Sequence, residues 1–284
     1  MQLKHIIITG GTGGIGLATA RMVGETGASV TLISRDSNKG RYIVSELREH
    51  AKNKNIDFVV ADLSSQQQIR QAAEKIINLH PVIDILVNNV GIWNSDFMLT
   101  GDGIEEMFAV NHLSYFLLTH CLIKGLKRSS SARIINVSSD SHFKGKIHWD
   151  DLNLTRHYHG LRAYGQSKLA NVLFTYGFAR KNPGYPITIN AVQPGLVKTN
   201  IGIKHTNLFH ALAWRLRRTG GVSPEQGAAT SVYLALSPEI EGFTGKYWDR
   251  CKAKDSSTAS YSIEDAIRLW NICEKLCGIE NYFS

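Results

Sequence analysis

The chain has 284 residues, of which 43% are hydrophobic and 20% are charged, and its formal net charge is +8. This length can bury a large core, and the composition is typical of a soluble globular protein. The sequence contains no run of about 18 apolar residues, so we expect no membrane-spanning helix.

The positive charge is not gathered into a long run of Lys and Arg, and no nucleic-acid-binding motif accompanies it. We therefore expect no nucleic-acid partner, and we interpret the charge as a basic cofactor pocket together with ordinary surface charge. The four cysteines, at positions 121, 251, 273 and 277, lack the paired spacing of a metal site. They predict reduced thiols, no bound metal and a cytoplasmic location.

Strand-like and helix-like segments alternate along the whole chain. Short runs rich in Val, Ile and Leu predict strands at 4–9, 29–34, 56–61, 83–88, 133–138, 187–192 and 245–248. The segments between and after them predict helices at 15–25, 39–52, 66–79, 103–126, 163–180, 224–236 and 262–277. This alternation predicts an α/β fold: one domain, residues 1–284, with a doubly wound parallel sheet (a Rossmann fold) and helices on both faces.

Two stretches interrupt the alternation, 141–160 and 198–221. Both follow strands, and ligands of open α/β sheets bind outside the carboxyl ends of the strands, so we expect both to form walls of a substrate site. The first carries histidines at 142, 148, 157 and 159 and is interpreted as a surface or substrate-lining loop. Leucines recur every four residues in the second, at 208, 212 and 216. This amphipathic pattern leaves open a lid, a partner surface or a helix in peripheral contact with a membrane.

A glycine-rich turn follows the first predicted strand and precedes a helix. Its sequence is Thr9-Gly10-Gly11-Thr12-Gly13-Gly14-Ile15-Gly16. Glycine lets the backbone approach a pyrophosphate closely, and a helix N-terminus offers free N–H groups and positive potential. The turn therefore predicts a dinucleotide site that includes Gly10, Thr12, Gly14, Ile15 and Gly16.

The end of the second strand bears on which dinucleotide binds. An acidic residue there favours NAD(H) and an arginine favours NADP(H), because arginine can pair with the 2′-phosphate. Arg35 and Asp36 follow Ser34 directly, and we prefer NADP(H) with Arg35 as the phosphate ligand, while NAD(H) stays open. In the alternative, Arg35 is a surface residue and Asp36 caps the next helix.

Polar residues end the next two strands. Asp62-Leu63 would border the adenine, and Asn88-Asn89-Val90-Gly91 would tie strand ends together and line the cofactor groove. Each could equally form a turn with no contact to a ligand.

Tyr164 and Lys168 are four residues apart in a predicted helix, so they lie on one face, one turn apart. A nearby ammonium favours the phenolate, which would prepare Tyr164 as a general acid or base. Ser138-Ser139 ends an upstream strand and can donate a hydroxyl to a substrate oxygen. Asn111, in the helical stretch before that strand, could hold a water beside Lys168 or satisfy a neighbouring carbonyl.

In this order along the chain, the motifs closely resemble those of the short-chain dehydrogenase/reductase family, of the compact one-domain type. The resemblance covers about 250 residues and is closest to the retinol-dehydrogenase-like branch. It is carried by Thr9-Gly10-x-x-x-Gly14-x-Gly16, Asp62-Leu63, Asn88-Asn89-Val90-Gly91, Asn111, Ser139, Tyr164-x-x-x-Lys168 and Pro194-Gly195-x-x-x-Thr199.

The resemblance implies roles for these residues. Tyr164 would exchange the proton, Ser139 would bind the substrate oxygen, and Asn111 would anchor a proton-relay water. Lys168 would lower the pKa of Tyr164 and bind the nicotinamide ribose. The remaining cofactor contacts would come from Asn89, Pro194, Gly195, Val197 and Thr199.

The sequence thus predicts an NADP(H)-dependent oxidoreductase that moves hydride between the nicotinamide and a carbonyl or alcohol carbon of a small apolar substrate, as a carbonyl reductase or retinol-dehydrogenase-like enzyme does. The resemblance also implies a homo-oligomer. The alternatives are a non-catalytic dinucleotide sensor or scaffold, and an NAD-preferring alcohol dehydrogenase.

Overall fold

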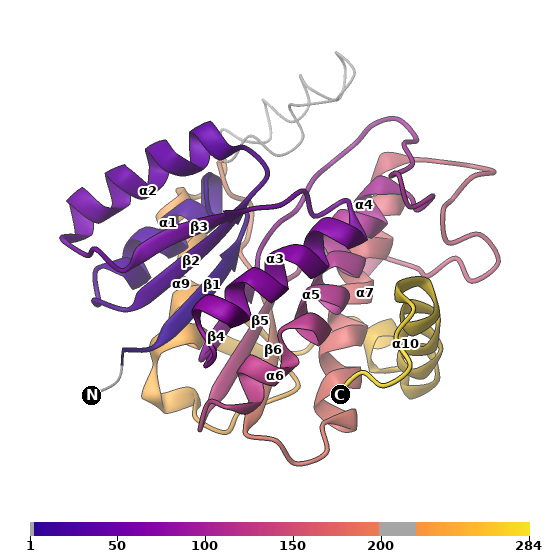
Figure 1. Ribbon diagram of the computed structural model, residues 1–284. Coiled ribbons are helices and arrows are strands. Elements are labelled where there is room, and N and C mark those ends of the chain that lie inside the picture. The colour runs from indigo at the N-terminus through magenta and orange to yellow at the C-terminus, as the bar shows by residue number, and fades with distance from the viewer. Residues whose placement is uncertain (1–2, 199–219) are drawn as a thin grey trace.

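The computed structural model describes residues 3–198 and 220–284, and its centre is one eight-stranded sheet (Figure 1). The strands lie in the order β3-β2-β1-β4-β5-β6-β7-β8. All neighbours from β3 to β7 are parallel, and β8 alone runs antiparallel, against β7. Their bounds are β1 His5–Thr9, β2 Ser29–Ser34, β3 Ile56–Val60, β4 Ile85–Asn88, β5 Ala132–Val137, β6 Ile187–Gln193, β7 Lys246–Asp249 and β8 Lys252–Lys254. The predicted fold class is confirmed, whereas β8 was not predicted, because three exposed residues carry no apolar pattern.

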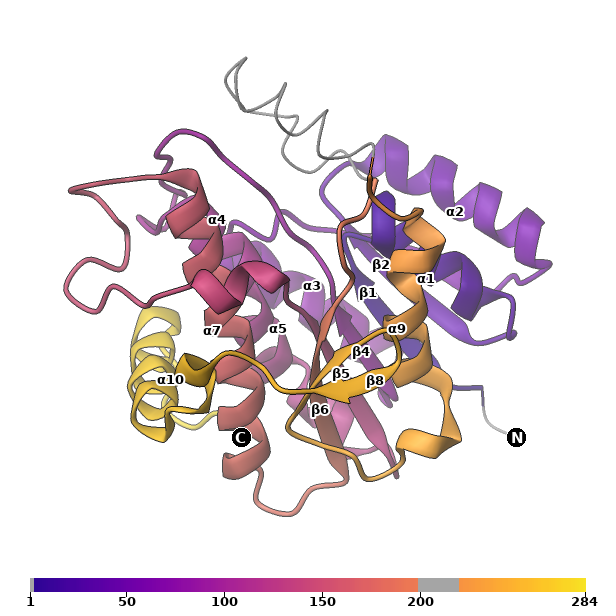
Figure 2. The same cartoon turned by 180° about the vertical axis from the view of Figure 1, so that it is seen from behind.

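Helices cover both faces of the sheet (Figure 2). On one face lie α1 Gly14–Gly24, α2 Ser37–Ala51 and α9 Pro224–Leu236; on the other lie α3 Gln66–Leu79, α5 Ser114–Cys121 and α7 Gly160–Lys181, with α10 Ile263–Cys277 packed outside α7. Alternate residues of β1 show the double coverage. Ile6 and Ile8 belong to the core on the α1 side, Ile7 belongs to the core on the α7 side, and all three are 0% exposed. A strand buried on both faces has no polar alternation, which is why these runs are continuously apolar.

The long helix predicted at 103–126 is wrong in its start and its continuity. Helix α4, Glu106–Phe108, begins later because the carboxylate of Glu105 accepts hydrogen bonds from the Met107 and Phe108 backbone N–H groups, at 3.0 and 2.7 Å. A π-helical turn, Ala109–Leu113, separates α4 from α5, and α6, Ile123–Lys127, follows. Such turns are frequent at functional sites, and this one contains Asn111.

The 141–160 insertion also differs from a plain loop. Its first residues belong to a 3₁₀ helix, Asp140–Lys144, and His142 there is 0% exposed. One ring nitrogen of His142, Nδ1, lies 2.7 Å from the Ser139 carbonyl oxygen, and the other accepts a hydrogen bond from the Ser257 N–H at 3.0 Å. His142 is therefore a buried link between two segments rather than a surface histidine.

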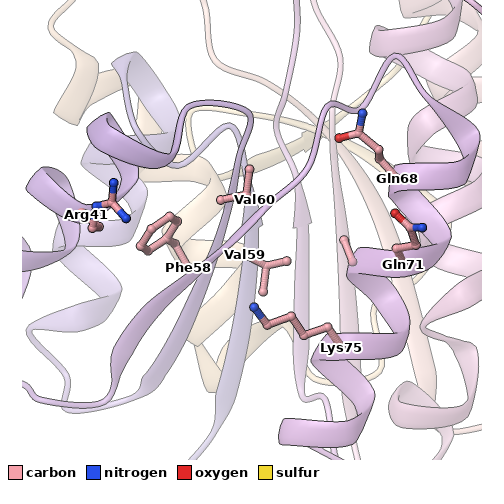
Figure 3. A pocket seen from close by; sticks show the side chains of 8 residues that line it. Arg41, Phe58, Val59, Val60, Gln68, Gln71 and Lys75 are labelled. Carbon is pink, nitrogen blue, oxygen red and sulfur yellow. The ribbon is translucent and has the colours of Figure 1, made fainter.

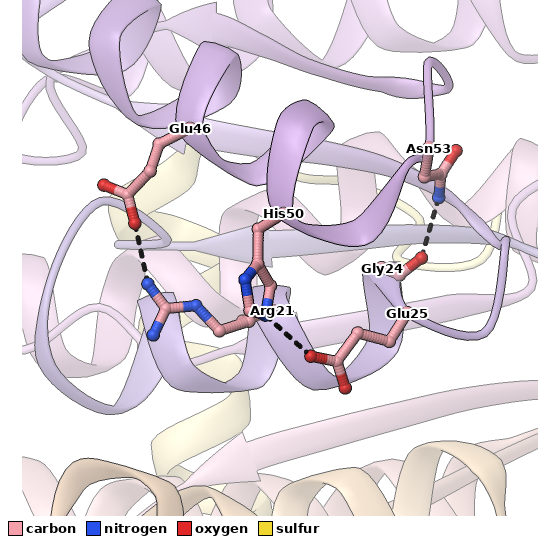
Figure 4. Close-up of polar contacts among 6 residues, drawn as sticks. All are labelled: Arg21, Gly24, Glu25, Glu46, His50 and Asn53. Atoms are coloured by element: carbon pink, nitrogen blue, oxygen red, sulfur yellow. Dashed lines mark hydrogen bonds and ion pairs between the residues drawn. The ribbon is translucent and has the colours of Figure 1, made fainter.

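Helices α1 and α2 are held together by side chains that the sequence pattern did not single out (Figure 4). Arg21 pairs with Glu46 at 2.7 Å, and His50 contacts Glu25 at 3.0 Å. Asn53 is buried and donates to the carbonyls of Gly24 and Ala28 at 2.9 and 2.8 Å. Exposed ion pairs stabilise little, so the buried amide contributes more to this contact. These contacts hold the middle and the end of α2, and the residues after it, against α1.

One edge of the sheet is β3, which borders a groove of about 460 Å³ between α2 and α3 (Figure 3). Phe58, Val59 and Val60 form its floor, and Arg41 and Lys75 flank it. Charged side chains beside an unpaired strand discourage pairing with another chain. We interpret this groove as a protected sheet edge.

Across the two described stretches of the chain, no helix combines the length and the apolar character that a membrane span requires.

Candidate active site

The glycine turn has the geometry of a phosphate cradle at the carboxyl end of β1. Gly10 and Gly14 have φ angles of +66° and +53°, which residues other than glycine rarely adopt. A Cβ on Gly16 would lie 2.4 Å from the Gly10 carbonyl oxygen, so the backbone packs too closely for any larger residue. Gly13 precedes α1 without a side-chain cap, which leaves the first N–H groups of this helix available to an anion.

The ends of β1 and β4 are locked together by Thr9. Its hydroxyl oxygen accepts hydrogen bonds from the Asn89 and Val90 backbone N–H groups at 2.8 and 2.9 Å, and the Asn89 side chain donates to the Thr9 carbonyl at 2.8 Å. Of the alternatives open for Asn89, the structure therefore shows the strand tie. The sequence did not predict that Thr9 ties the two strand ends, because this depends on a contact between residues 80 positions apart.

At the end of β2, the acidic residue and the basic residue have different environments. Asp36 caps α2, where its carboxylate accepts from the N–H groups of Asn38 and Lys39, both at 3.0 Å. Arg35 is exposed and makes no hydrogen bond or ion pair with the described residues. The Lys39 ammonium, which the sequence analysis did not single out, lies 3.5 Å from the position a Cβ on Gly13 would occupy. The Lys39 ammonium thus flanks the cradle and Arg35 directly follows β2, the strand beside β1, while the Asp36 carboxylate is engaged in the cap.

Asp62 and Leu63, which follow β3, are engaged in contacts within the protein, and their contact with a cofactor stays a prediction. The Asp62 carboxylate accepts from the Ser64 N–H and hydroxyl at 2.9 and 2.8 Å, which forms a local turn. The side chain of Leu63 is 6% exposed and belongs to the core. Leu63 can therefore border a ligand through its backbone rather than its side chain.

Tyr164, Lys168 and Ser139 come together at the carboxyl end of β5. Ser139 follows this strand, and its side chain is hydrogen-bonded to Tyr164 on α7. One turn further along α7, the Lys168 ammonium lies 5.5 Å from the centre of the Tyr164 ring and 5.9 Å from that of Tyr115. It donates to the Val137 carbonyl at 3.1 Å and is almost fully buried. The predicted grouping of these three residues is present in the structure.

The ionisation of this pair differs from the prediction. Burial raises the pKa of Tyr164 to about 12, and the hydrogen bond with Ser139 opposes the rise. Burial also lowers the pKa of Lys168 to about 7. In the protein by itself Lys168 does not lower the pKa of Tyr164, because the low-dielectric surroundings favour the neutral form of both groups.

Asn111 is 0% exposed, and its side chain faces Ile92. Its Oδ1 accepts from the Ile92 N–H at 2.7 Å, and its Nδ2 donates to the Ile92 carbonyl at 3.0 Å and to the Ser167 hydroxyl at 3.2 Å. The Asn111 carbonyl accepts from the Asn171 side chain at 2.8 Å. Of the two alternatives, the side chain therefore satisfies neighbouring backbone groups, and the relay water stays a prediction.

An apolar wall adjoins the Tyr164 ring. Trp93 meets it edge-on with ring centres 5.5 Å apart. Leu154 and Tyr158 from the 141–160 insertion pack in the same cluster, together with Met107 and Ala163. The insertion thus packs beside Tyr164, and its part in a substrate site stays a prediction.

The segment after β6 lies over the start of α1. Val197 forms a bridge with Val222, and a Cβ on Gly227 would lie 2.6 Å from a Val197 methyl carbon and 3.4 Å from Ile15. Gly195 has a φ of +77° and follows Pro194 in the same turn. Val197 is therefore close to the start of α1, and the contacts of Pro194, Gly195 and Val197 with a cofactor stay a prediction. Thr199 and residues 199–219 of the 198–221 stretch lie outside the described residues.

Comparison with known proteins identifies the family of this chain. Residues 4–207 match the family described as short chain dehydrogenase. Retinol dehydrogenase 12 of Mus musculus is 40% identical over 277 residues, which are 98% of this chain and 87% of that protein. Retinol dehydrogenase 13 of Homo sapiens is 39% identical, covering 98% and 85%. Short-chain dehydrogenase TIC 32 B, chloroplastic, of Brassica napus is 38% identical, covering 97% and 90%.

Among solved structures, an uncharacterized protein from Mycobacterium paratuberculosis matches with a TM-score of 0.78 and 29% identity, over 98% of this chain and 94% of that one. Levodione reductase has a TM-score of 0.70 at 21% identity, over 86% and 94%, and shows the fold alone. The family uses nicotinamide cofactors, which agrees with the cradle at β1. The chain therefore belongs to the short-chain dehydrogenase/reductase family, in its retinol-dehydrogenase-like branch, and is an oxidoreductase that acts on alcohol or carbonyl groups.

Proposed function

We propose that this chain is an NADP(H)-dependent oxidoreductase that transfers hydride between the nicotinamide and a carbonyl or alcohol carbon of a small apolar substrate, with Tyr164 as the general acid or base. The observation that carries the proposal is the grouping of Tyr164, Ser139 and Lys168 at the carboxyl end of β5. Parallel strands β1, β4 and β5 are neighbours, so this group and the glycine turn share one edge of the sheet.

The cofactor, when bound, supplies the hydride donor or acceptor. The protein handles the proton. With a pKa of about 12, the Tyr164 hydroxyl is protonated at neutral pH and ready to donate to a carbonyl oxygen that becomes an alkoxide. Ser139 can donate a second hydrogen bond to that oxygen. Lys168, with a pKa of about 7, carries a proton that can be exchanged at neutral pH and so can return one to the phenolate.

Preference for NADP(H) is supported by Lys39 beside the cradle, by Arg35 at the end of the neighbouring strand β2, and by the engagement of Asp36 in the helix cap. A guanidinium and an ammonium are suited to a 2′-phosphate, which NAD(H) lacks. Arg35→Ala and Lys39→Ala should each raise the KM for NADPH roughly tenfold and leave that for NADH unchanged, as expected for one lost charge-assisted bond. Arg41→Ala is the matched control, because Arg41 is exposed on the same helix and bonds to Asn38 instead. Equal losses for both cofactors would contradict the assignment.

The substrate class is inferred from the wall beside Tyr164 and from relatives named as retinol dehydrogenases. A wall of Trp93, Leu154 and Tyr158 favours an apolar alcohol or aldehyde over a charged metabolite. A panel of apolar aldehydes, retinaldehyde among them, tested beside charged carbonyl compounds of similar size should give higher kcat/KM for the apolar group.

Tyr164→Phe separates the proposal from a sensor or scaffold. It removes the proton donor and keeps the ring, so turnover should fall by at least about a hundredfold while the Kd for NADPH stays the same. Cofactor binding without turnover of any carbonyl by the wild-type protein would favour the sensor. Higher kcat/KM with NAD⁺ and an alcohol than with NADPH and a carbonyl would favour an NAD-preferring alcohol dehydrogenase.

A further inference from the structure

Asn171 lies one turn after Lys168 on α7 and is 0% exposed. Its Nδ2 donates to the Asn111 carbonyl at 2.8 Å and to the Val137 carbonyl at 3.4 Å. The Val137 carbonyl also accepts from the Lys168 ammonium at 3.1 Å. The buried Asn171 amide thus connects the π-helical turn with the Val137 carbonyl at the end of β5, and this carbonyl is also the acceptor of the Lys168 ammonium.

The orientation of this amide is fixed by its two carbonyl acceptors together with the His112 ring. The Asn171 nitrogen donates to two carbonyls, so its oxygen must face the His112 Nδ1, 3.0 Å away. An oxygen accepts, so Nδ1 carries the hydrogen, and Nε2 of the neutral ring is left to accept from the Cys273 thiol at 3.4 Å. Burial lowers the pKa of His112 to about 4, which keeps the ring neutral. Donor and acceptor are therefore assigned for each hydrogen bond that connects Cys273, His112, Asn171 and Val137.

We infer that Asn171, oriented by His112, is a positioning residue for the reaction, because its amide shares the Val137 carbonyl with Lys168 and so determines how far the ammonium is drawn from Tyr164. The inference rests on the proposed function. Without the amide, the Val137 carbonyl would be free to bind the ammonium more strongly. The Asn111 carbonyl would lose a buried donor, which loosens the π-helical turn.

The groups facing Lys168 come from three elements. They are Tyr164 on α7, Tyr115 on α5 and His112 on the π-helical turn. None of them carries a negative charge at neutral pH, since burial raises the pKa of both tyrosines and holds His112 neutral. In these surroundings the Val137 carbonyl is the one hydrogen-bond acceptor of the ammonium among the described residues, so loss of the other donor to this carbonyl should change the pKa of Lys168.

The test compares Asn171→Leu with the pair His112→Asn and His112→Gln. The amide nitrogen of Asn can take the place of Nδ1 and keep the bond to Asn171, whereas that of Gln takes the place of Nε2 and loses it. Cys273→Ala is the control, because Cys273 bonds to His112 and makes no contact with Asn171 in this series of hydrogen bonds. Two quantities are measured: kcat and KM with NADPH, and the titration of the Lys168 side chain by the ¹³Cε shift in labelled protein without cofactor, assigned with Lys168→Met.

Asn171→Leu should lower kcat about tenfold with a KM for NADPH within roughly threefold of wild type, and should shift the Lys168 midpoint upward. His112→Asn and Cys273→Ala should resemble wild type in both measurements, and His112→Gln should resemble Asn171→Leu. An unchanged Lys168 midpoint in Asn171→Leu, or equal behaviour of the two His112 variants, overturns the inference. Should Asn171→Leu fail to fold, the His112 pair decides. If wild type turns over no carbonyl, the proposed function fails, and the Lys168 titration alone decides the inference.

Discussion

Replacing Lys168 with methionine exchanges a buried ammonium for an uncharged side chain of similar length. The ammonium is almost completely removed from water and has one hydrogen bond to the protein among the described residues, to the Val137 carbonyl. Its pKa is lowered from 10.5 to about 7 by burial. We expect Lys168→Met to abolish turnover and, at the same time, to make the folded protein more stable.

The size of the gain follows from proton linkage. At pH 7 the unfolded chain holds a full proton on this lysine and the folded chain about half of one, a difference of roughly 4 kcal/mol in favour of unfolding. Loss of the hydrogen bond to the Val137 carbonyl offsets about 1 kcal/mol of the gain. Allowing for relaxation around a buried charge, a net gain of roughly 2–3 kcal/mol corresponds to a Tm rise of about 4–6 °C for a chain of this size.

The pH dependence gives the sharper test. Between pH 7 and 10.5 the unfolded state binds more protons at Lys168 than the folded state, so the wild type gains stability as pH rises, by at most about 1.4 kcal/mol per pH unit from this group. Lys168→Met lacks this contribution. Urea denaturation of both proteins at pH 7, 8 and 9, without cofactor, should show the advantage of the variant shrinking at each step.

Two results would refute the reasoning. One is a variant that is less stable than wild type at pH 7. The other is a stability difference that stays constant from pH 7 to 9, since it would show that Lys168 titrates alike in the folded and unfolded chains.

Three further expectations concern other residues. Gly16→Ala should abolish NADPH binding, measured by fluorescence titration, because the added methyl would lie 2.4 Å from the Gly10 carbonyl oxygen, whereas Gly101→Ala, with open space around it, should bind normally. Burial raises the pKa of Glu105 to about 7, so its folded form gains stability as pH falls from 7 to 4.5; denaturation curves of Glu105→Gln should lack this gain. Thr9→Val removes an acceptor shared by two N–H groups and should cost about 1–3 kcal/mol in unfolding free energy.

The parts of the fold that follow from local pattern were predictable. The run Ile6-Ile7-Ile8 is buried on both faces of the sheet, and the strand there was predicted within one residue of its observed start. Tyr164 and Lys168 meet because a spacing of four residues on one helix determines their separation. Both features depend on residues close together in sequence.

What could not be predicted depends on contacts across the chain. Asn111 binds the backbone of Ile92, 19 residues away, and Thr9 binds Asn89, 80 residues away. The pKa values of Tyr164 and Lys168 likewise depend on contacts across the chain. Spacing alone predicts that an ammonium lowers the pKa of a neighbouring phenol, but the surrounding layers of α5, α7 and β5 remove water from both groups, and desolvation outweighs their mutual effect.

Desolvation therefore connects the stability of this fold with its chemistry. Lys168, Tyr164 and His112 all reside where burial favours their neutral forms, and for Lys168 that environment opposes folding at neutral pH. The same burial brings the pKa of Lys168 close to 7, where a proton can be both held and released. A better-solvated lysine would stabilise the protein but would hold its proton throughout the neutral range, instead of holding and releasing it near pH 7. Burial of the Lys168 ammonium thus both lowers the stability of the fold and permits proton transfer near pH 7. A substitution that removes the buried ammonium should therefore raise stability and abolish proton transfer.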